Sequence, residues 1–236
     1  MEATRLSKAQ WTHVMKPLLS IALQKAGISE KSPRVMVYTS RQYHWLGLKH
    51  PWYHQQLKHI YTLIGETANK TPTGLLIQAS AESLRLEIGL PGTFRDVPWK
   101  QLKGILISTW LTDLFYFLGE HNFFLHDPLP QLQLQREGDI FLIQCFLLAK
   151  PTDIELRRLM DCREYLQVTT LAAITSVDGK NILSQTWGGL QYKRKINSVA
   201  WSRQPPRKHL DWQLWQHTLS PLLTNINTRT LKYPLK

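Results

Sequence analysis

The sequence predicts a mainly α-helical protein of six to eight helices that ends in an irregular basic segment. Three observations support this fold class. Apolar residues recur at intervals of three and four along most of the chain. Capping residues stand at the starts of several of these stretches. Hydrophobic residues make up 43% of the 236 residues and charged residues only 19%, so the chain can bury a sizeable core and is not a disordered tail.

The length suits one domain or two small ones, and we predict two regions. Residues 1–179 carry the helical patterns. Residues 180–236 are basic and Trp-rich and end in a helix.

A first helix is expected to begin after Ser7 and to end at Gly27. Ser7 and Gln10 have the spacing of a capping box, and the apolar residues that follow predict one buried stripe. Pro17 should kink or split this helix, because proline lacks the backbone N–H and its ring clashes with the preceding turn.

Residues 34–38 could form a short strand, and residues 39–51 are expected to form a loop, since Gly47 and Pro51 interrupt regular patterns. A second helix is expected over 52–68. Its inward-facing residues are predicted to be Leu57, Ile60, Tyr61 and Ile64.

A third helix is expected over 72–88, because Pro72 suits the first turn of a helix and Gly89 suits the position after the last. Residues 90–97 are rich in Gly and Pro and are expected to form a linker. A long helix should then run over 98–118.

In the remaining chain, Asp139 is expected to cap a buried helix over 140–149, although a run of ten apolar residues could also be a strand. A capped helix is expected over 152–174. Residues 180–206 should be irregular, and a last helix is expected over 209–223.

The charge distribution is uneven. The chain carries 29 Lys and Arg against 17 Asp and Glu, a formal net charge of +12, and residues 1–60 carry +7, residues 61–179 carry −4 and residues 180–236 carry +9. Basic regions of this size are typical of proteins that contact a phosphate backbone. Two solvated basic faces that only keep the chain soluble would produce the same pattern.

The strongest local pattern lies in residues 192–208, where Lys and Arg alternate with aromatic residues. This combination suits phosphate contact together with base stacking, although a solvated loop whose Trp packs on the domain remains an alternative. The candidate nucleic-acid-binding residues are Lys193, Arg194, Lys195, Trp201, Arg203, Arg207 and Lys208, with Arg34 and Arg41 from the basic N-terminal region.

Sequence motifs of the common enzyme classes are absent. The Asp residues are scattered, whereas two-metal phosphoryl transfer needs clustered carboxylates, and there is no phosphate-binding glycine loop or nucleophile elbow. We therefore predict no catalytic residue, metal or cofactor in this chain. An enzyme such as a nuclease would require separated carboxylates to converge in space.

Four histidines fall within sixteen positions: His44, His50, His54 and His59. His50 and His54 have the spacing of metal ligands on a helix, but Pro51 lies between them and no acid stands nearby, so packing and surface roles are favoured over a metal site. Cys145 is expected to be a small core residue. Cys162 could be partly exposed, but no His is near it in the sequence, which disfavours a nucleophilic role.

No membrane partner is expected. The longest strongly apolar runs are much shorter than the ~20 residues that span a bilayer, and residues 1–10 lack the pattern of a secretory signal. We therefore expect an intracellular protein, in the cytoplasm or nucleus, with free thiols.

The order of short motifs along the chain is similar to that of a known family. The motifs are AGI at 26–28, PRVMVY at 33–38, WLGL at 45–48, TGLL at 73–76, REGD at 136–139, CREYLQV at 162–168, TLAAIT at 170–175 and RQPP at 203–206. Over roughly residues 15–220, this order resembles the region C-terminal to the reverse-transcriptase domain in retrotransposon polyproteins. The Gly-Gly-Leu-Gly of that family is replaced here by His44-Trp45-Leu46-Gly47.

The resemblance implies a non-catalytic C-terminal piece of an RNA-directed DNA polymerase. The Tyr-x-Asp-Asp palm motif that binds two metal ions would lie upstream, so Mg²⁺ is implied only for that palm and no catalytic residue carries over. Residues 1–179 would then be thumb- or connection-like. The implied partners are the upstream palm domain and template–primer nucleic acid, as RNA or DNA duplex or RNA–DNA hybrid, bound by shape rather than sequence.

A helical protein-interaction module with no nucleic-acid role is the alternative. In that case the charge serves solubility, and Trp11, Trp45 and Trp52 would line a groove.

Overall fold

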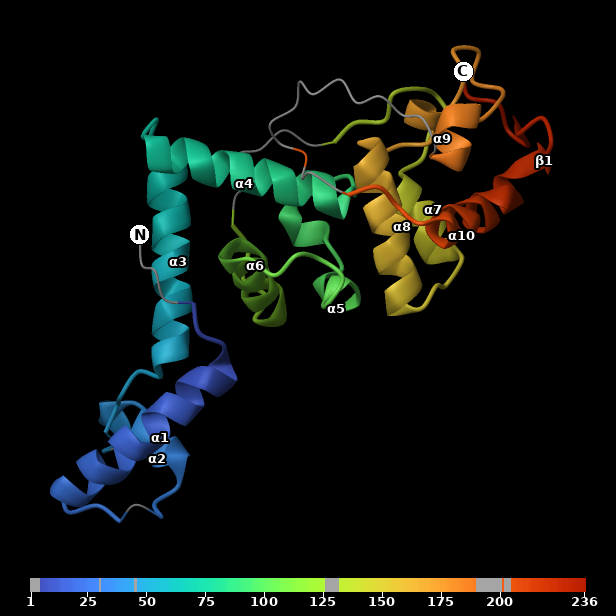
Figure 1. Ribbon diagram of the computed structural model, residues 1–236. Coiled ribbons are helices and arrows are strands. Elements are labelled where there is room, and N and C mark those ends of the chain that lie inside the picture. Colours follow the sequence, from blue (N-terminus) through green and yellow to red (C-terminus); the bar gives the residue numbers. More distant parts are fainter. Residues whose placement is uncertain (1–4, 30, 45, 126–131, 190–200, 202–204) are drawn as a thin grey trace. The chain divides into compact units, whose positions relative to one another are not determined.

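Helices dominate the computed structural model, which describes residues 5–29, 31–44, 46–125, 132–189, 201 and 205–236 (Figure 1). These residues form ten α-helices, four short 3₁₀ helices and one two-stranded antiparallel ribbon. The mainly α-helical class is confirmed. There are more helices than the six to eight predicted, because short helices form where a strand and an irregular segment were expected and because one predicted long helix is divided in two. None of the helices in these ranges has both the length and the apolar character of a membrane span.

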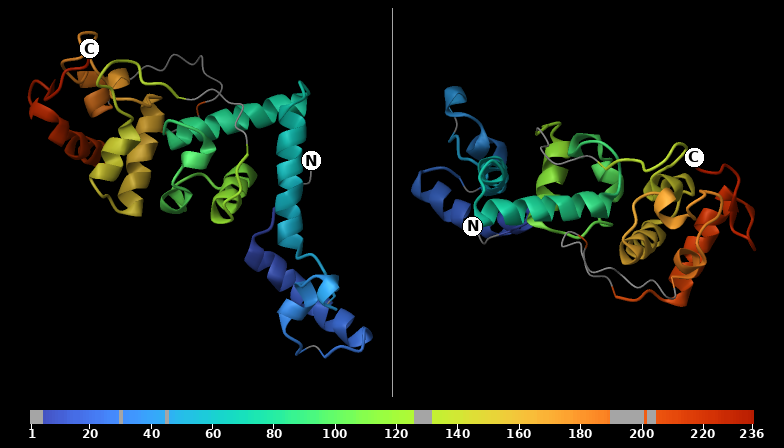
Figure 2. Two further views of the ribbon diagram at one scale, coloured as in Figure 1. Left: turned by 180° about the vertical axis from the view of Figure 1, so that it is seen from behind. Right: turned by 90° about the horizontal axis from the view of Figure 1, so that it is seen from above.

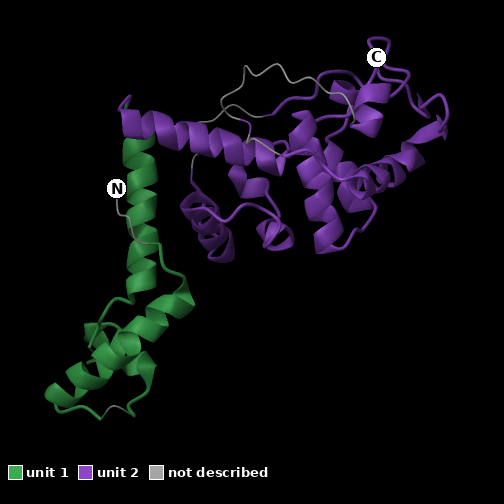
Figure 3. Cartoon of the chain, viewed as in Figure 1, with its two compact units in different colours: residues 1–69 green, residues 70–236 purple. Residues whose placement is uncertain are grey.

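The chain consists of two compact units, residues 1–69 (unit 1) and residues 70–236 (unit 2; Figure 3). This division differs from the predicted boundary at 179/180. The described residues beyond 180 belong to unit 2, since Thr175 pairs with Ile182 in an isolated antiparallel bridge and the Glu137 N–H donates to the Lys236 carbonyl at 3.2 Å. Long-range backbone pairing of this kind leaves no signal in local composition.

Unit 1 contains helices α1 (Lys8–Lys25), α2 (Arg34–Tyr38) and α3 (Pro51–Thr67) and a 3₁₀ helix, η1 (Arg41–Tyr43). Its core is small. Leu19, Leu23 and Val37 are buried, and four partly buried side chains pack on them: Met15, Ile28, Tyr38 and Leu46.

The start of α1 follows the prediction. Ser7 Oγ accepts a hydrogen bond from the Gln10 N–H at 3.2 Å, and Gln10 Oε1 accepts from the Ser7 N–H at 2.8 Å, which completes the capping box. Pro17 lies inside the helix without splitting it. Val14 and Leu18 are exposed, so the buried stripe is narrower than the apolar spacing predicted.

Residues 34–38 form α2, and the predicted strand is wrong. Pro33 precedes the helix, and its carbonyl accepts a hydrogen bond from the Met36 N–H at 3.0 Å. The chain then folds back, so that the N–H of Leu46 and the N–H of Leu48 donate to the carbonyls at the end of α2. Local turn bonds therefore determine the conformation of this segment, despite its β-branched residues.

The buried face of helix α3 is not the face that the apolar spacing predicted. It buries Gln55, Gln56, His59 and Leu63. Leu57, Tyr61 and Ile64, predicted to face inward, are 43%, 73% and 53% exposed. The apolar spacing identified a helix correctly, but it identified the wrong face as the buried one.

Unit 2 is built mainly from helices. Its described helices are α4 (Pro72–Ile88), η2 (Phe94–Asp96), α5 (Trp99–Leu102), α6 (Trp110–Glu120), α7 (Leu142–Leu148), α8 (Asp153–Leu166), η3 (Ala172–Ile174), α9 (Ser184–Gly188), α10 (His209–Leu219) and η4 (Ser220–Leu222). Helices α7, α8 and α10 pack side by side (Figure 2). Between them Phe146 and Trp215 are fully buried, with their rings in an edge-to-face contact at 5.6 Å.

Two predicted helices of unit 2 are too long. The helix expected over 98–118 is divided into α5 and α6, because Gly104 adopts a left-handed φ of +85° and Thr109 then caps a new helix. The helix expected over 152–174 ends at Leu166. There Gln167 takes a left-handed φ of +56°, and Thr170 pairs with Phe141 instead of continuing the helix.

The run over 140–149 forms a helix, α7, rather than the alternative strand. After α10, which ends four residues before the predicted limit, the chain forms strands β1 (Leu223–Asn225) and β2 (Thr230–Leu231). Helix α9 lies within the segment 180–206 that was expected to be irregular.

Candidate nucleic-acid interface

Unit 1 displays a dense set of exposed cations. All nine of its Lys and Arg side chains are exposed: Arg5, Lys8, Lys16, Lys25, Lys31, Arg34, Arg41, Lys49 and Lys58. Glu66 is the one acidic residue among the described residues of unit 1. The surface of unit 1 therefore has a strongly positive potential that attracts polyanions.

Aromatic rings and a cation meet where α3 begins. The Lys8 ammonium lies 5.2 Å from the ring centroids of both Trp52 and Tyr53, and it donates a hydrogen bond to the Tyr53 hydroxyl at 3.3 Å. His50 extends this cluster, with its ring 5.1 Å from that of Tyr38 and 5.9 Å from that of Tyr53. The exposed parts of these rings offer surfaces on which a base or sugar can stack.

Gln55 positions Lys8 in this cluster. Its side-chain amide bonds both backbone groups of Leu6, with Nε2 donating to the carbonyl at 3.2 Å and Oε1 accepting from the N–H at 3.3 Å. The same Oε1 accepts from the Trp11 indole N–H at 2.8 Å. Because Gln55 is buried and holds residues on both sides of Lys8, the start of α1 is tied to α3.

His50 is the N-cap of α3. Its Nδ1 accepts a hydrogen bond from the Trp52 N–H at 3.2 Å, and Pro51 occupies the first helical position. Partial burial and the nearby Lys8 charge lower the pKa of His50 below its ordinary value of 6.5. A neutral imidazole is therefore favoured at this helix terminus.

Two of the predicted binding residues, Arg34 and Arg41, lie on unit 1 and are exposed. Arg34 begins α2. Burial raises the pKa of Tyr38 above its ordinary value, and the nearby Arg34 charge reduces this shift. Arg41 Nε donates to the Leu46 carbonyl at 3.4 Å, which holds the side chain beside Gly47 and leaves the end of the guanidinium available.

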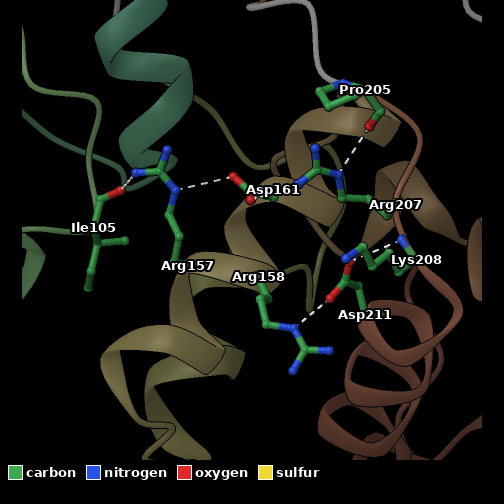
Figure 4. A network of polar contacts seen from close by, with 8 residues as sticks. All are labelled: Ile105, Arg157, Arg158, Asp161, Pro205, Arg207, Lys208 and Asp211. Carbon is green, nitrogen blue, oxygen red and sulfur yellow. Dashed lines mark hydrogen bonds and ion pairs between the residues drawn. The ribbon is translucent and has the colours of Figure 1, made fainter.

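The described candidate residues of the C-terminal segment belong to unit 2, and they are less exposed or contact other residues of that unit. Arg207 is 14% exposed and makes an ion pair with Asp161 of α8 at 2.7 Å (Figure 4). Lys208 is exposed and stands at the N-cap of α10, where its N–H donates to Asp211 at 3.1 Å, and Trp201 is half-buried. Lys193, Arg194, Lys195 and Arg203 lie outside the described residues.

Arg207 belongs to a network that holds the segment before α10 against α8. Asp161 also pairs with Arg157 at 3.3 Å, and Arg158 pairs with Asp211 at 2.5 Å (Figure 4). In unit 2 these cations are neutralised by acids of the same unit. Unit 1, by contrast, holds nine Lys and Arg against three acids in its sequence, Glu2, Glu30 and Glu66.

Metal-ligating side chains and thiols are two kinds of reactive group among the described residues. No three His, Cys, Asp or Glu side chains in the described ranges are arranged to hold a metal ion. Cys145 and Cys162 are both buried free thiols, and burial raises their pKa values to about 11 and about 12. The partial exposure considered for Cys162 is therefore wrong, and neither sulfur is a ready thiolate at neutral pH.

Sequence reasoning missed the cluster of Lys8, His50, Trp52 and Tyr53, because Lys8 is more than forty residues away from the other three. Part of the signal was present, because Pro51 suits the first position of a helix and so indicates that α3 begins there. Comparison of the chain with protein-family models, with curated proteins and with solved structures finds no match in any of the three.

Proposed function

We propose that unit 1 binds nucleic acid through its phosphate backbone, without sequence preference. We further propose that the chain is a non-catalytic, post-palm part of a retroelement RNA-directed DNA polymerase, acting in the cytoplasm or nucleus. The observation that carries the binding proposal is the exposure of all nine Lys and Arg side chains of unit 1, whose sequence holds three acids. The order of sequence motifs supports the polymerase assignment.

The physical argument rests on counterion release. Each cation that meets a phosphate frees condensed counterions, which makes affinity strong at low salt and steeply salt-dependent. The aromatic rings beside Lys8 add stacking that tolerates any base. Duplex RNA, duplex DNA and RNA–DNA hybrid are the proposed ligands, and an upstream palm domain would supply the Mg²⁺ chemistry.

The test is fluorescence anisotropy of the full chain with a labelled RNA–DNA hybrid over a range of KCl concentrations. The test variant reverses three exposed charges of unit 1, Arg34→Glu, Arg41→Glu and Lys49→Glu. The matched control reverses three exposed charges of unit 2, Lys100→Glu, Lys103→Glu and Lys232→Glu.

We expect the unit 1 variant to lose on the order of 100-fold in affinity, with the slope of log K against log[salt] smaller by about 2 to 3, and the control to lose much less. Equal losses in the two variants would refute unit 1 as the interface. An affinity that does not respond to salt, or no binding at low salt, would refute phosphate binding altogether.

The helical interaction module remains the second candidate, and one observation favours it. Helix α3 exposes an apolar stripe of Leu57, Tyr61 and Ile64, which soluble proteins usually cover. Of the three tryptophans expected to line a groove, Trp11 and Trp52 are half-buried near the start of α3, and Trp45 lies outside the described residues.

The two candidates respond oppositely to mutation. A Tyr61→Ser, Ile64→Ser variant should lose a protein partner and keep its affinity for nucleic acid, whereas the charge-reversal variant should do the reverse. Quantitative cross-linking mass spectrometry of both variants in cells separates the two candidates. A partner lost equally from both variants would not support the module.

A further inference from the structure

Unit 2 contains a cavity of about 400 Å³ between the C-terminal half of α4 and the segment that leads into α6. This volume lies within the ~300–1,000 Å³ typical of small-molecule sites. Two exposed residues, Leu76 and Thr109, belong to its lining, so a ligand can reach it from solvent. The lining residues that offer polar groups or apolar surface to a ligand include Ser80, Ser83, Leu84, Glu87, Trp110 and Leu111.

Among the described residues that line this cavity, Glu87 is the only one with an ionisable side chain. It is buried, and its Oε1 accepts a hydrogen bond from the Ile107 N–H at 2.6 Å. No described residue forms a hydrogen bond with Oε2. The cavity therefore offers a ligand one carboxyl oxygen that no described group uses.

No described cation forms an ion pair with the Glu87 carboxyl. Arg157 and Arg163 are close enough to lower its pKa, but neither lines the cavity, and both donate hydrogen bonds to backbone carbonyls. The Glu164 charge acts in the opposite direction, and burial raises the pKa of Glu87 to about 7. A buried carboxylate without a paired cation is costly, so a cationic ligand at Oε2 would stabilise it.

The rest of the lining suits a ligand that donates hydrogen bonds and has an apolar body. The Ser83 hydroxyl forms no hydrogen bond with a described residue, and Ser80 donates its proton to the Leu76 carbonyl at 2.7 Å, so both oxygens can accept. An ammonium group has three donors and no acceptor, which matches this set of acceptors. The half-buried Trp110 and the leucines supply apolar surface, and an indole face also attracts a cation.

We propose that this cavity binds a small organic amine, as an ammonium cation on a compact apolar body. The ammonium group donates hydrogen bonds to Oε2 of Glu87 and to a serine hydroxyl, and the apolar body packs against Trp110 and the leucines. The ligand is opposite in charge to the polyanion proposed for unit 1. The two proposals therefore concern different ligands and different units of the chain, and neither depends on the other.

The test compares three probes with the same phenyl body: phenethylamine, phenethyl alcohol and phenylacetate. Each is titrated into the full ¹⁵N-labelled chain at about pH 8, where a carboxyl with a pKa of about 7 is mostly ionised, and chemical shifts are followed at the Ile107 and Glu87 amides. We expect phenethylamine to bind with a Kd of about 1 mM or below. The neutral alcohol and the anion should bind at least about tenfold more weakly, because they lose the charge-assisted hydrogen bond.

Two variants and a control localise the binding. Glu87→Gln keeps the size of the side chain and an acceptor for the Ile107 N–H, and its loss of charge should weaken phenethylamine binding at least about tenfold. Ser83→Phe fills the cavity from a half-buried position and should abolish binding. Glu82→Gln changes an exposed acid of α4 that does not line the cavity and should leave binding unchanged. If Ser83→Phe fails to fold, Glu87→Gln decides the question.

The proposal is overturned if phenethylamine does not shift these amides at about 10 mM, if the alcohol or the anion binds as well as the amine, or if Glu87→Gln binds the amine as tightly as wild type. Nα-acetyl-lysinamide carries the same ammonium group on a flexible chain, and equal binding of this probe would assign the site to a protein lysine instead of a small amine. The unit 1 charge-reversal variant should still bind phenethylamine. Failure here would leave the salt-dependent binding of polynucleotides by unit 1 untouched, so the two proposals fail separately.

Discussion

Glu87, Arg163 and Glu164 bring three ionisable side chains into the interior of unit 2, where charges are costly. The fully buried Arg163 donates to the backbone carbonyls of Leu86 and Glu87 at the end of α4, and burial lowers its pKa to about 10. Gly89 then has to be glycine for two reasons. Its φ is +67°, and an added Cβ would collide with the Arg163 guanidinium.

Glu87 predicts a specific pH dependence of stability. Its pKa in the folded protein is about 7, above the ordinary value of 4.5, so the fold favours the protonated form. The free energy of unfolding should therefore be highest below pH 4.5, fall between pH 4.5 and 7 by up to about 3 kcal/mol from this group, and stay level above.

Glu87→Gln keeps an acceptor for the Ile107 N–H and cannot titrate. We expect the difference in unfolding free energy between wild type and this variant to change across that pH window, measured by urea denaturation of both proteins. Glu82→Gln, on the exposed face of the same helix, should show no such change. Parallel pH profiles for wild type and Glu87→Gln would show that the carboxyl titrates normally.

At the scale of secondary-structure elements, the start of α3 depends on a titratable cap. The pKa of His50 is lower in the fold than its ordinary 6.5, so the fold favours neutral imidazole, and cap stability should decrease as the pH falls below 6.5. Protonation of Nδ1 removes the acceptor for the Trp52 N–H and adds a charge beside Lys8.

His50→Asn should make the first turn of α3 independent of pH, because asparagine caps well and does not titrate. Amide hydrogen exchange at Trp52 measures the effect: we expect faster exchange on acidification in wild type than the intrinsic rate explains, and none of that excess in the variant. His54→Asn, exposed on the same helix, serves as the control. An excess that persists in His50→Asn would point to another titrating group.

The end of α8 offers a second element-scale prediction. Gln167 holds a left-handed φ of +56°, which costs a residue with a Cβ about 1 kcal/mol and costs glycine almost nothing. Gln167→Gly should therefore stabilise unit 2 by about 0.5–1 kcal/mol in urea denaturation. Gln213→Gly, inside α10, should destabilise it by a similar amount. A loss of stability in both variants would mean that the Gln167 side chain matters more than its backbone.

At the scale of the whole molecule, the structure separates cations that hold the fold from cations available to a ligand. Asp161 pairs with Arg157 and Arg207, so Asp161→Asn should lower the free energy of unfolding by about 1–2 kcal/mol without weakening nucleic-acid binding. The double variant Arg34→Glu, Arg41→Glu should weaken nucleic-acid binding and leave the free energy of unfolding almost unchanged. Substitutions at exposed positions rarely change that free energy by more than about 0.5 kcal/mol.

Urea denaturation and anisotropy titration of the same preparations measure both quantities. Asp153→Asn changes the net charge equally at an exposed position of α8 and makes no ion pair with a described residue, so it serves as the control for Asp161→Asn. Loss of nucleic-acid affinity in Asp161→Asn would show that the Arg207 region takes part in binding after all.

Predictions that rest on bonds between near neighbours were correct. The capping boxes of α1 and α8, the proline that begins α4 and the glycine that ends α4 all depend on residues within one helical turn of each other. Pro51, predicted to belong to a loop, is instead the first residue of α3. Predictions about faces and ends of helices were less accurate. In α3 the buried residues include Gln55, whose partners Leu6 and Trp11 are more than forty positions away.

The candidate site was predicted in part for the same reason. Composition located the basic regions, and Arg34 and Arg41 are exposed on one of them. It did not reveal that Arg207 is paired with Asp161, or that Lys8 lies over Trp52 and Tyr53. Ion pairs and ring contacts between distant residues depend on how the helices pack, and local sequence patterns do not predict that packing.

The sequence by itself determined the helical class, most helix starts and the excess of cations in the first sixty residues, because propensity, capping and charge are properties of neighbouring residues. Only the tertiary structure decided where the two units divide, which arginines are neutralised and that Glu87 is buried beside a cavity. Those outcomes arise from residues brought together across tens of positions, where burial and pairing set the energy of each charge.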